Sequence, residues 1–197
     1  MNNRLFVAVI GERNAGKSTT WNTLFGRTVN TGKKPRSLKI FAANSVDVRL
    51  ISGSNEEKRR NLSEVLADTK LDVFLISGSN EEKKRYAQKV LENVDCRIVL
   101  CSVQYVEEAF ERTWGYVFSK GFSIYAQWLN PGHHGGDTWD RLGLVNRLLA
   151  NNAVVSMRDG REDDTRLHAR VEEIRQYIHG WAAPRGLLRS GPGDNDS

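Results

Sequence analysis

Cysteine is scarce in this chain of 197 residues, and long apolar runs are missing. The two cysteines, Cys96 and Cys101, lie five positions apart on one predicted strand, so we expect them to point to opposite faces and to remain unpaired. Buried thiols of this kind are typical of a reducing compartment. No stretch approaches the roughly 20 apolar residues of a membrane span, and residues 1–4 lead into a strand without a signal-peptide pattern. These absences predict a cytoplasmic protein.

A patch of charge of one sign is also lacking. The net charge is +5, but the basic residues are scattered or alternate with acidic ones, so charge alone indicates no nucleic-acid partner. Length and composition predict one compact domain with its own core. We assign residues 1–182 to this domain. Residues 183–197 end in a stretch rich in glycine, aspartate and serine, which predicts a disordered C-terminal tail.

The strongest motif follows the apolar run of residues 5–10 and precedes the helix-like residues 19–25. Residues 11–18 are Gly-Glu-Arg-Asn-Ala-Gly-Lys-Ser, the pattern of a phosphate-binding P-loop between a strand and a helix. We expect Lys17 to reach the β- and γ-phosphates and to act in catalysis, and Ser18 to bind Mg²⁺. The alternative is a glycine-rich turn without a ligand. The predicted nucleotide-binding residues are Gly11, Glu12, Arg13, Asn14, Ala15, Gly16, Lys17, Ser18 and Thr19.

Strands and helices are predicted to alternate along the chain. Residues 27–37 are polar and basic and are expected to form a mobile loop beside the phosphates. The pattern predicts an α/β fold, a doubly wound, mostly parallel sheet of the P-loop NTPase type. The predicted strands after the first are residues 38–42, 46–52, 97–102, 122–129 and 153–157, and the later helices are residues 106–118, 138–151 and 164–181.

The sequence contains an internal repeat, which would add one further βα unit to the fold. Residues 46–60 recur as residues 71–85, with twelve of fifteen positions identical. A structural interpretation explains each Ser-Gly-Ser-Asn-Glu-Glu as a turn and a helix cap. A functional interpretation, valid if both repeat strands flank the P-loop strand, places the loops near the γ-phosphate, where Glu56 or Glu81 would polarise a water molecule. Four serines, Ser52, Ser54, Ser77 and Ser79, would then donate to phosphate.

The loop of residues 130–137 carries His133, His134 and Asp137. These side chains could bind a metal ion, but no third ligand lies at a known metal spacing. An exposed or loop-ordering role is the alternative.

The segment from Arg4 to about Lys39 resembles the Era/EngA-type bacterial GTPases of the translation-factor-related class. The resemblance is carried by Gly11, Asn14, Gly16, Lys17, Ser18, Thr19, Asn22, Leu24 and Gly26, followed by Gly-Arg-x-Val-x-Thr at 26–31 and Lys-Pro at 34–35. It implies a G-domain-like fold, a GTP-binding switch, Mg²⁺ as cofactor, and Ser37 near the switch-I threonine that closes on the metal.

Beyond residue 39 the family motifs are degenerate. The Asp-x-x-Gly motif corresponds to residues 52–55, which lack the aspartate. The guanine-reading Asn-Lys-x-Asp falls at residues 101–104, or at residues 130–133 if the repeat adds one βα unit, and neither stretch has the aspartate. The last motif, Ser-Ala-x-x-Gly, is echoed by residues 156–160.

Three functional hypotheses follow. The first is a GTPase-like switch with slow hydrolysis, whose ordered form is bound by an effector protein or an oligomeric partner. The second is an ATPase or phosphotransferase using the same P-loop. The third is a nucleotide-sensing module without efficient turnover, which loss of the Asp-x-x-Gly aspartate favours because that group orients Mg²⁺.

Overall fold

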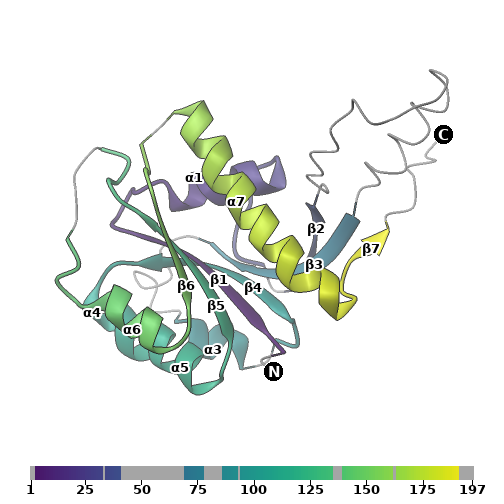
Figure 1. Cartoon of the computed structure of the whole chain (residues 1–197), viewed down its shortest axis with the longest axis horizontal. Coiled ribbons are helices and arrows are strands. Elements are labelled where there is room, and N and C mark those ends of the chain that lie inside the picture. The colour runs from purple at the N-terminus through teal and green to yellow at the C-terminus, as the bar shows by residue number, and fades with distance from the viewer. Residues whose placement is uncertain are drawn as a thin grey trace.

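The computed structural model describes residues 3–32, 34–40, 69–77, 86–92, 94–134, 139–161 and 163–190. Within these ranges seven strands form one sheet with helices on both faces (Figure 1). The strands are β1 (Leu5–Gly11), β2 (Arg36–Ile40), β3 (Thr69–Ile76), β4 (Ile98–Gln104), β5 (Ser123–Leu129), β6 (Val154–Arg158) and β7 (Arg189–Ser190). The alternating α/β architecture expected from the sequence is confirmed.

Helical segments connect these strands. They are α1 (Lys17–Phe25), α3 (Ala87–Leu91), α4 (Glu107–Ala109), a π-helical segment (Phe110–Trp114), α5 (Gly115–Ser119), α6 (Leu144–Ala150), α7 (Asp164–Ala182) and a 3₁₀ turn (Ala183–Arg185). Gly26 ends α1 in the left-handed region with φ 64°, as its position after the helix predicts. Asp163 begins α7, because its side chain accepts a hydrogen bond from the Arg166 N–H at 2.9 Å.

The strand order is β2-β3-β4-β1-β5-β6, and β7 pairs with the start of β3 on the side away from β2. The strands from β3 to β6 run parallel, whereas β2 and β7 are antiparallel to β3. The strand that precedes the P-loop therefore lies in the middle of the sheet, between β4 and β5. Its carboxyl end aligns Ile10 with Val103 on one side and Trp128 on the other.

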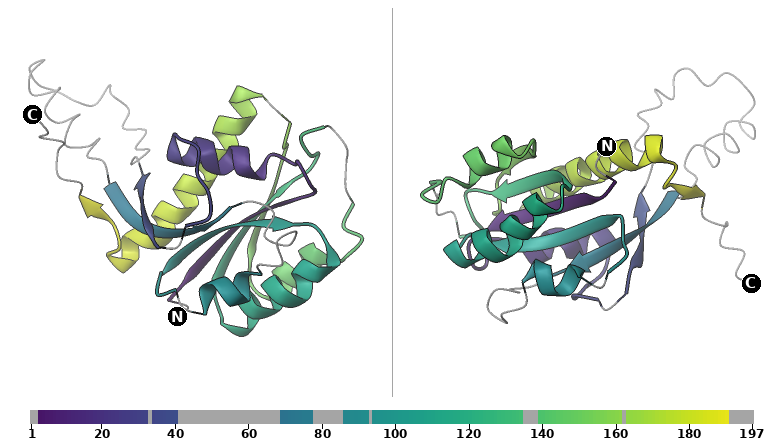
Figure 2. Two further views of the ribbon diagram at one scale, coloured as in Figure 1. Left: turned by 180° about the vertical axis from the view of Figure 1, so that it is seen from behind. Right: turned by 90° about the horizontal axis from the view of Figure 1, so that it is seen from below.

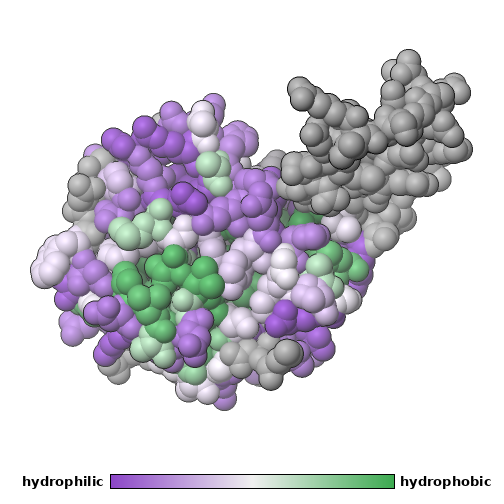
Figure 3. Space-filling view, in the orientation of Figure 1, coloured by the Kyte–Doolittle hydropathy of each residue, from purple (hydrophilic) through white to green (hydrophobic). Residues whose placement is uncertain are grey.

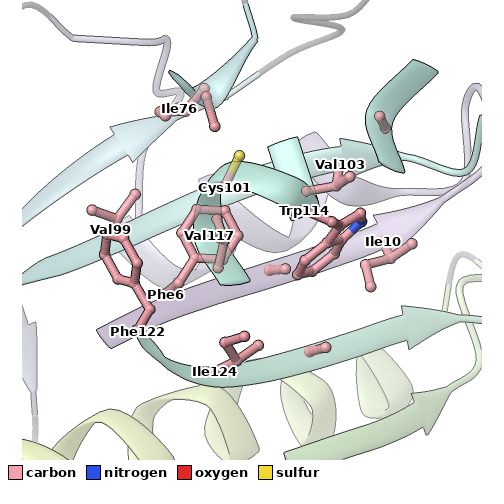
Figure 4. Close-up of a cluster of buried hydrophobic side chains, with 14 of the residues drawn as sticks. Phe6, Ile10, Ile76, Val99, Cys101, Val103, Trp114, Val117, Phe122 and Ile124 are labelled. Carbon is pink, nitrogen blue, oxygen red and sulfur yellow. The ribbon is translucent and has the colours of Figure 1, made fainter. Parts of the chain in front are cut away.

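Both faces of β1 are buried, which explains its unbroken apolar sequence. Phe6, Ala8 and Ile10 pack into a cluster with the helices between β3 and β6 (Figure 4). Alternate residues of the strand enter a second cluster that includes Trp21 of α1 and Ile174 of α7. Two views show α1 and α7 on one face of the sheet and α3, α5 and α6 on the other (Figure 2). The sheet is thus doubly wound.

An apolar area lies on the outer surface above α6 and β6 (Figure 3). Leu149, Val154 and Met157 are exposed there. Elsewhere the view of Figure 3 is largely polar or mixed, as is usual for a water-facing surface.

Three local expectations differ from the structure. Both cysteines are free and buried, but they enter the same cluster, because Cys96 precedes β4 and strand alternation does not reach it. Helix α6 begins at Leu144 and not near residue 138, since the Asp140 carboxylate accepts from the N–H groups of Leu144 and Val145 at 2.8 Å each. Residues 183–190, predicted as the start of a disordered tail, form the 3₁₀ turn and β7.

Candidate functional site

The P-loop follows β1 directly and ends where α1 begins, as the motif predicts. Asn14 has φ 60° and Gly16 has φ 91°, so two residues of the loop lie in the left-handed region. Glycine and asparagine tolerate this region better than other residues. Alternating backbone conformations of this kind turn successive N–H groups toward one side, which is the geometry of an anion-binding concavity. The positive N-terminal end of α1 faces the same place.

The two glycines of the motif are required by close packing. A Cβ at Gly11 would lie 2.6 Å from the Ala15 Cβ, well inside van der Waals contact. A Cβ at Gly16 would lie 3.0 Å from the Gly160 carbonyl oxygen and would also be strained by the positive φ. A side chain at Gly11 would therefore clash within the loop, and one at Gly16 would clash with the backbone at Gly160.

Lys17 is buried and folds back over the start of the loop. Its ammonium donates to the carbonyl oxygens of Gly11 at 2.9 Å and Glu12 at 2.5 Å. This places one positive charge at the concavity, where a phosphate would lie. Ser18 and Thr19 are exposed in the first turn of α1, so the Ser18 hydroxyl is accessible to a metal ion.

Two distant loops form a wall against the P-loop. The Gly160 N–H donates to the Pro131 carbonyl at 2.7 Å, and a Cβ on Gly160 would lie 2.6 Å from the Ala15 carbonyl oxygen. A Cβ on Gly132 would lie 3.6 Å from the Ala15 Cβ. The structure thus brings Pro131 and Gly132, from one of the two positions considered for the base-reading motif (residues 130–133), together with Gly160, the end of the last motif at residues 156–160.

The other candidate position for the base-reading motif, residues 101–104, forms the end of β4. Gln104 is aligned with Gly11 across the parallel ladder, and the Tyr105 N–H donates to the Gly11 carbonyl at 3.1 Å. This segment therefore lies beside the first glycine of the P-loop, on the side of β1 that leads toward β3. Gln104 stands where this candidate motif would have its aspartate, and its alignment with Gly11 follows from the strand order, which the sequence does not encode.

Arg170 is a residue that the sequence did not reveal. It lies in α7 with 2% of its surface exposed, and its Nε donates to the Thr20 Oγ1 at 3.1 Å. Its terminal nitrogens contact the Asp159 carbonyl at 3.0 Å and approach the place of a Cβ on Gly16 at 3.2 Å. Burial lowers the pKa of Arg170 and Asp159 opposes this. Arg170 therefore adds positive charge beneath the P-loop and joins α7, α1 and the 159–160 loop.

The polar loop after α1 is tied to the end of β3 through Thr31. The Thr31 hydroxyl donates to the Ser77 carbonyl at 2.5 Å and accepts from the Ser77 N–H at 2.9 Å. Ser37 lies elsewhere, in β2, and lines a pocket with Leu24 and Arg27 at the end of α1. At 1.5 Å per residue, the helix separates this end from Ser18 by roughly 10 Å. The structure does not bring the two predicted metal ligands together.

The repeat is described only in part. Glu56, Glu81, Ser52, Ser54 and Ser79 lie outside the described residues, so their predicted roles remain predictions. The strand of the second copy forms β3, which β4 separates from β1. The functional interpretation required both repeat strands to flank the P-loop strand, and the second copy does not meet this condition. The reason is that β4 lies between them, and the order of strands across a sheet is not encoded in the sequence pattern.

His133 and His134 contact each other edge to face, with ring centroids 4.9 Å apart, and Asp137 lies outside the described residues. Within the described ranges, no group of three His, Cys, Asp or Glu side chains is arranged to hold a metal ion. Nor does any helix there have the length and apolar character needed to cross a membrane.

A central strand, a glycine-bounded loop, a buried lysine and a following helix define a P-loop nucleotide-binding protein of the doubly wound α/β class. Residues 6–114, more than half of the chain, match the family described as 50S ribosome-binding GTPase, and the chain belongs to this family. It is accordingly a P-loop GTP-binding protein. Comparison with curated proteins and with solved structures gave no significant match.

Proposed function

We propose that this protein is a Mg²⁺-dependent GTP-binding switch that hydrolyses nucleotide slowly. The observation that carries the proposal is the P-loop itself, where Lys17 and the start of α1 converge on one concavity. Gly11 and Gly16 leave room there that a Cβ would fill. Ser18 is the described residue suited to hold Mg²⁺, which would neutralise phosphate charge when bound.

The switch element in this proposal is the loop of residues 27–35. Thr31 connects it to Ser77 at the carboxyl end of β3, the edge of the sheet to which the P-loop also belongs. In this proposal, nucleotide binding at the P-loop moves this loop and breaks the two Thr31–Ser77 hydrogen bonds. We assign Thr31, in place of Ser37, as the residue that would respond to GTP.

A nucleotide-sensing role without turnover is the second candidate, and one observation favours it. Strand β3 ends at Ile76 and is followed by Ser77-Gly78, so no carboxylate stands directly after this strand. A group that orients Mg²⁺ or water would have to come from elsewhere, for instance from the predicted Glu56 or Glu81.

The first test measures binding of fluorescent GTP, GDP and ATP analogues with and without Mg²⁺, with phosphate release followed in the same samples. We expect Mg²⁺-dependent, guanine-selective binding and slow phosphate release. Lys17→Ala should weaken binding by about tenfold or more, because a charge-assisted hydrogen bond contributes about 1.5–3 kcal/mol. Lys89→Ala, an exposed lysine of α3, serves as the control and should bind normally.

Other outcomes are equally decisive. Tight guanine-selective binding without phosphate release would support the sensing role. Equal binding of ATP and GTP, or stronger binding of ATP, would point to an ATPase or phosphotransferase. Unchanged binding in Lys17→Ala would contradict the use of the P-loop altogether.

A further inference from the structure

A pocket of about 450 Å³ lies at the end of α1 farthest from the P-loop. Its walls come from three elements that meet there: the end of α1, the β2–β3 ladder and α7. The residues that matter for its chemistry are Phe25, Arg27, Ser37, Lys39, Lys70 and Arg175. The volume falls within the range of about 300–1,000 Å³ that is usual for small-molecule sites.

The lining of this pocket carries four positive side chains and, among its described residues, no carboxylate. Lys39 and Lys70 are directly opposite each other in the antiparallel β2–β3 pair. Like charges in this position destabilise a sheet. The antiparallel pairing places two lysine residues next to each other, where one bound anion could contact both.

Two nearby carboxylates are already paired, Glu172 with Arg175, which is one of the four pocket cations, and Asp72 with Arg189, which is not. Glu172 contacts the Arg175 guanidinium at 3.6 Å, and Asp72 pairs with Arg189 at 3.0 Å. Arg175 is further positioned by a 3.1 Å hydrogen bond from its Nη2 to the Leu24 carbonyl, which fixes the guanidinium at the end of α1. The pocket thus has one held cation, Arg175, and three more around it.

Further positively charged side chains lie next to the pocket. A neighbouring hollow shares Arg27 and adds Lys34 and Arg36. Burial and the nearby charge of Arg27 both lower the pKa of Arg36, which shows how closely these cations are grouped. Arg36 also lies over the Phe25 ring at 5.8 Å, so an apolar surface is present among the charges.

We propose that this pocket is a second anion site, separate from the P-loop, for a small organic molecule that carries two or more phosphate groups. The phosphates are bound by Arg27, Lys39, Lys70 and Arg175, with the Ser37 hydroxyl as an additional donor. The organic part packs against Phe25 and Leu24. A small ligand fits better than a nucleic acid because Lys70 and Arg175 are only partly exposed within a concave pocket. This site does not depend on the proposed GTP switch.

Calorimetric titration with adenosine 3′,5′-bisphosphate tests the proposal, first in the Lys17→Ala protein so that the P-loop does not contribute. We expect one binding site, and a loss of affinity of about tenfold or more in Lys39→Gln/Lys70→Gln. The matched control is Lys89→Gln/Lys120→Gln, which removes the same net charge from exposed lysines outside the pocket and should bind like the parent. In the wild-type protein the pocket variant should leave GTP binding intact.

Thermal melting provides a readout that does not depend on the titration. Without ligand, Lys39→Gln/Lys70→Gln should melt at the same or a higher temperature than the parent, because the opposed charges are gone. The bisphosphate should raise the melting temperature of the parent and of the control, but not that of the pocket variant. Equal binding by the pocket and control variants would overturn the proposal, and so would binding of an eight-nucleotide single-stranded RNA in the absence of any bisphosphate binding.

Discussion

At the scale of single residues, Gly160 makes the tightest packing contact between the P-loop and the rest of the chain. A Cβ there would lie 2.6 Å from the Ala15 carbonyl oxygen and 3.0 Å from the Pro131 carbonyl oxygen, both backbone atoms that cannot rotate away. We expect Gly160→Ala to push the P-loop out of shape and to weaken nucleotide binding by about tenfold or more, with a stability loss of about 1–3 kcal/mol. Nucleotide titration and urea unfolding measure the two effects.

Gly180 is the matched control for that substitution. It lies in α7 and is exposed, and a Cβ there meets nothing within 4 Å. Gly180→Ala should therefore raise stability by about 0.5–1 kcal/mol, since alanine has less backbone freedom to lose in a helix. If both alanine variants showed the same stability and the same nucleotide affinity, the close packing of Gly160 against the P-loop would not determine either property.

Asp159, next to Gly160, makes the stability of this region dependent on pH. Hydrogen bonds from Arg161, together with the charges of Arg161 and Arg166, lower the pKa of the Asp159 carboxyl from 3.8 to about 2. A carboxyl with a lowered pKa stabilises the fold fully above its unfolded value, and that contribution is lost as the pH falls toward 2.

We expect the wild-type protein to lose part of its stability between about pH 4 and pH 2 for this reason, whereas Asp159→Asn should lack that component. The measurement is the melting temperature across this pH range for both proteins. The effect should be modest because the pairs are partly exposed. Parallel pH curves would show that Asp159 contributes nothing.

At the scale of elements, α7 joins the P-loop helix to the wall of the site through one buried side chain. Arg170→Met would leave the Thr20 hydroxyl and the Asp159 carbonyl without their donor, which costs about 1–3 kcal/mol. Removal of a positive charge next to Gly16 should also weaken binding of an anionic nucleotide more than binding of a nucleoside. The ratio of affinities for GDP and guanosine measures that difference, and an unchanged ratio would make Arg170 a purely structural residue.

Elements defined by local signals were predictable from the sequence. The P-loop, α1 with its terminal Gly26 and α7 with its apolar face match the structure within one or two residues. The residues that contact these elements from distant parts of the chain could not be predicted. Arg170 and Thr20 are 150 residues apart, and Thr31 and Ser77 are 46 apart. Such pairs depend on the lateral order of strands and on helix packing, which the periodicity of one segment does not specify.

At the scale of the whole molecule, the C-terminal segment pairs with the start of β3, on the side away from the edge strand β2. Leu187 and Leu188 pack against the same cluster as Trp21 and Ile174, and β7 pairs with β3 at Thr69 and Lys70. The Arg189–Asp72 ion pair is largely exposed and adds little. Most of the stabilisation from this segment should therefore come from the two leucines and the strand pairing.

We expect truncation after Gly186 to lower the free energy of unfolding by about 1–3 kcal/mol, the usual range for losing partly buried apolar side chains. Truncation after Ser190 keeps every described contact of the segment and should leave stability unchanged. Urea unfolding of the two shortened proteins measures the difference. Since β3 carries Lys70 and leads to Ser77, the shorter protein should also bind the bisphosphate less well. Equal stability of both truncations would show that the sheet is complete without β7.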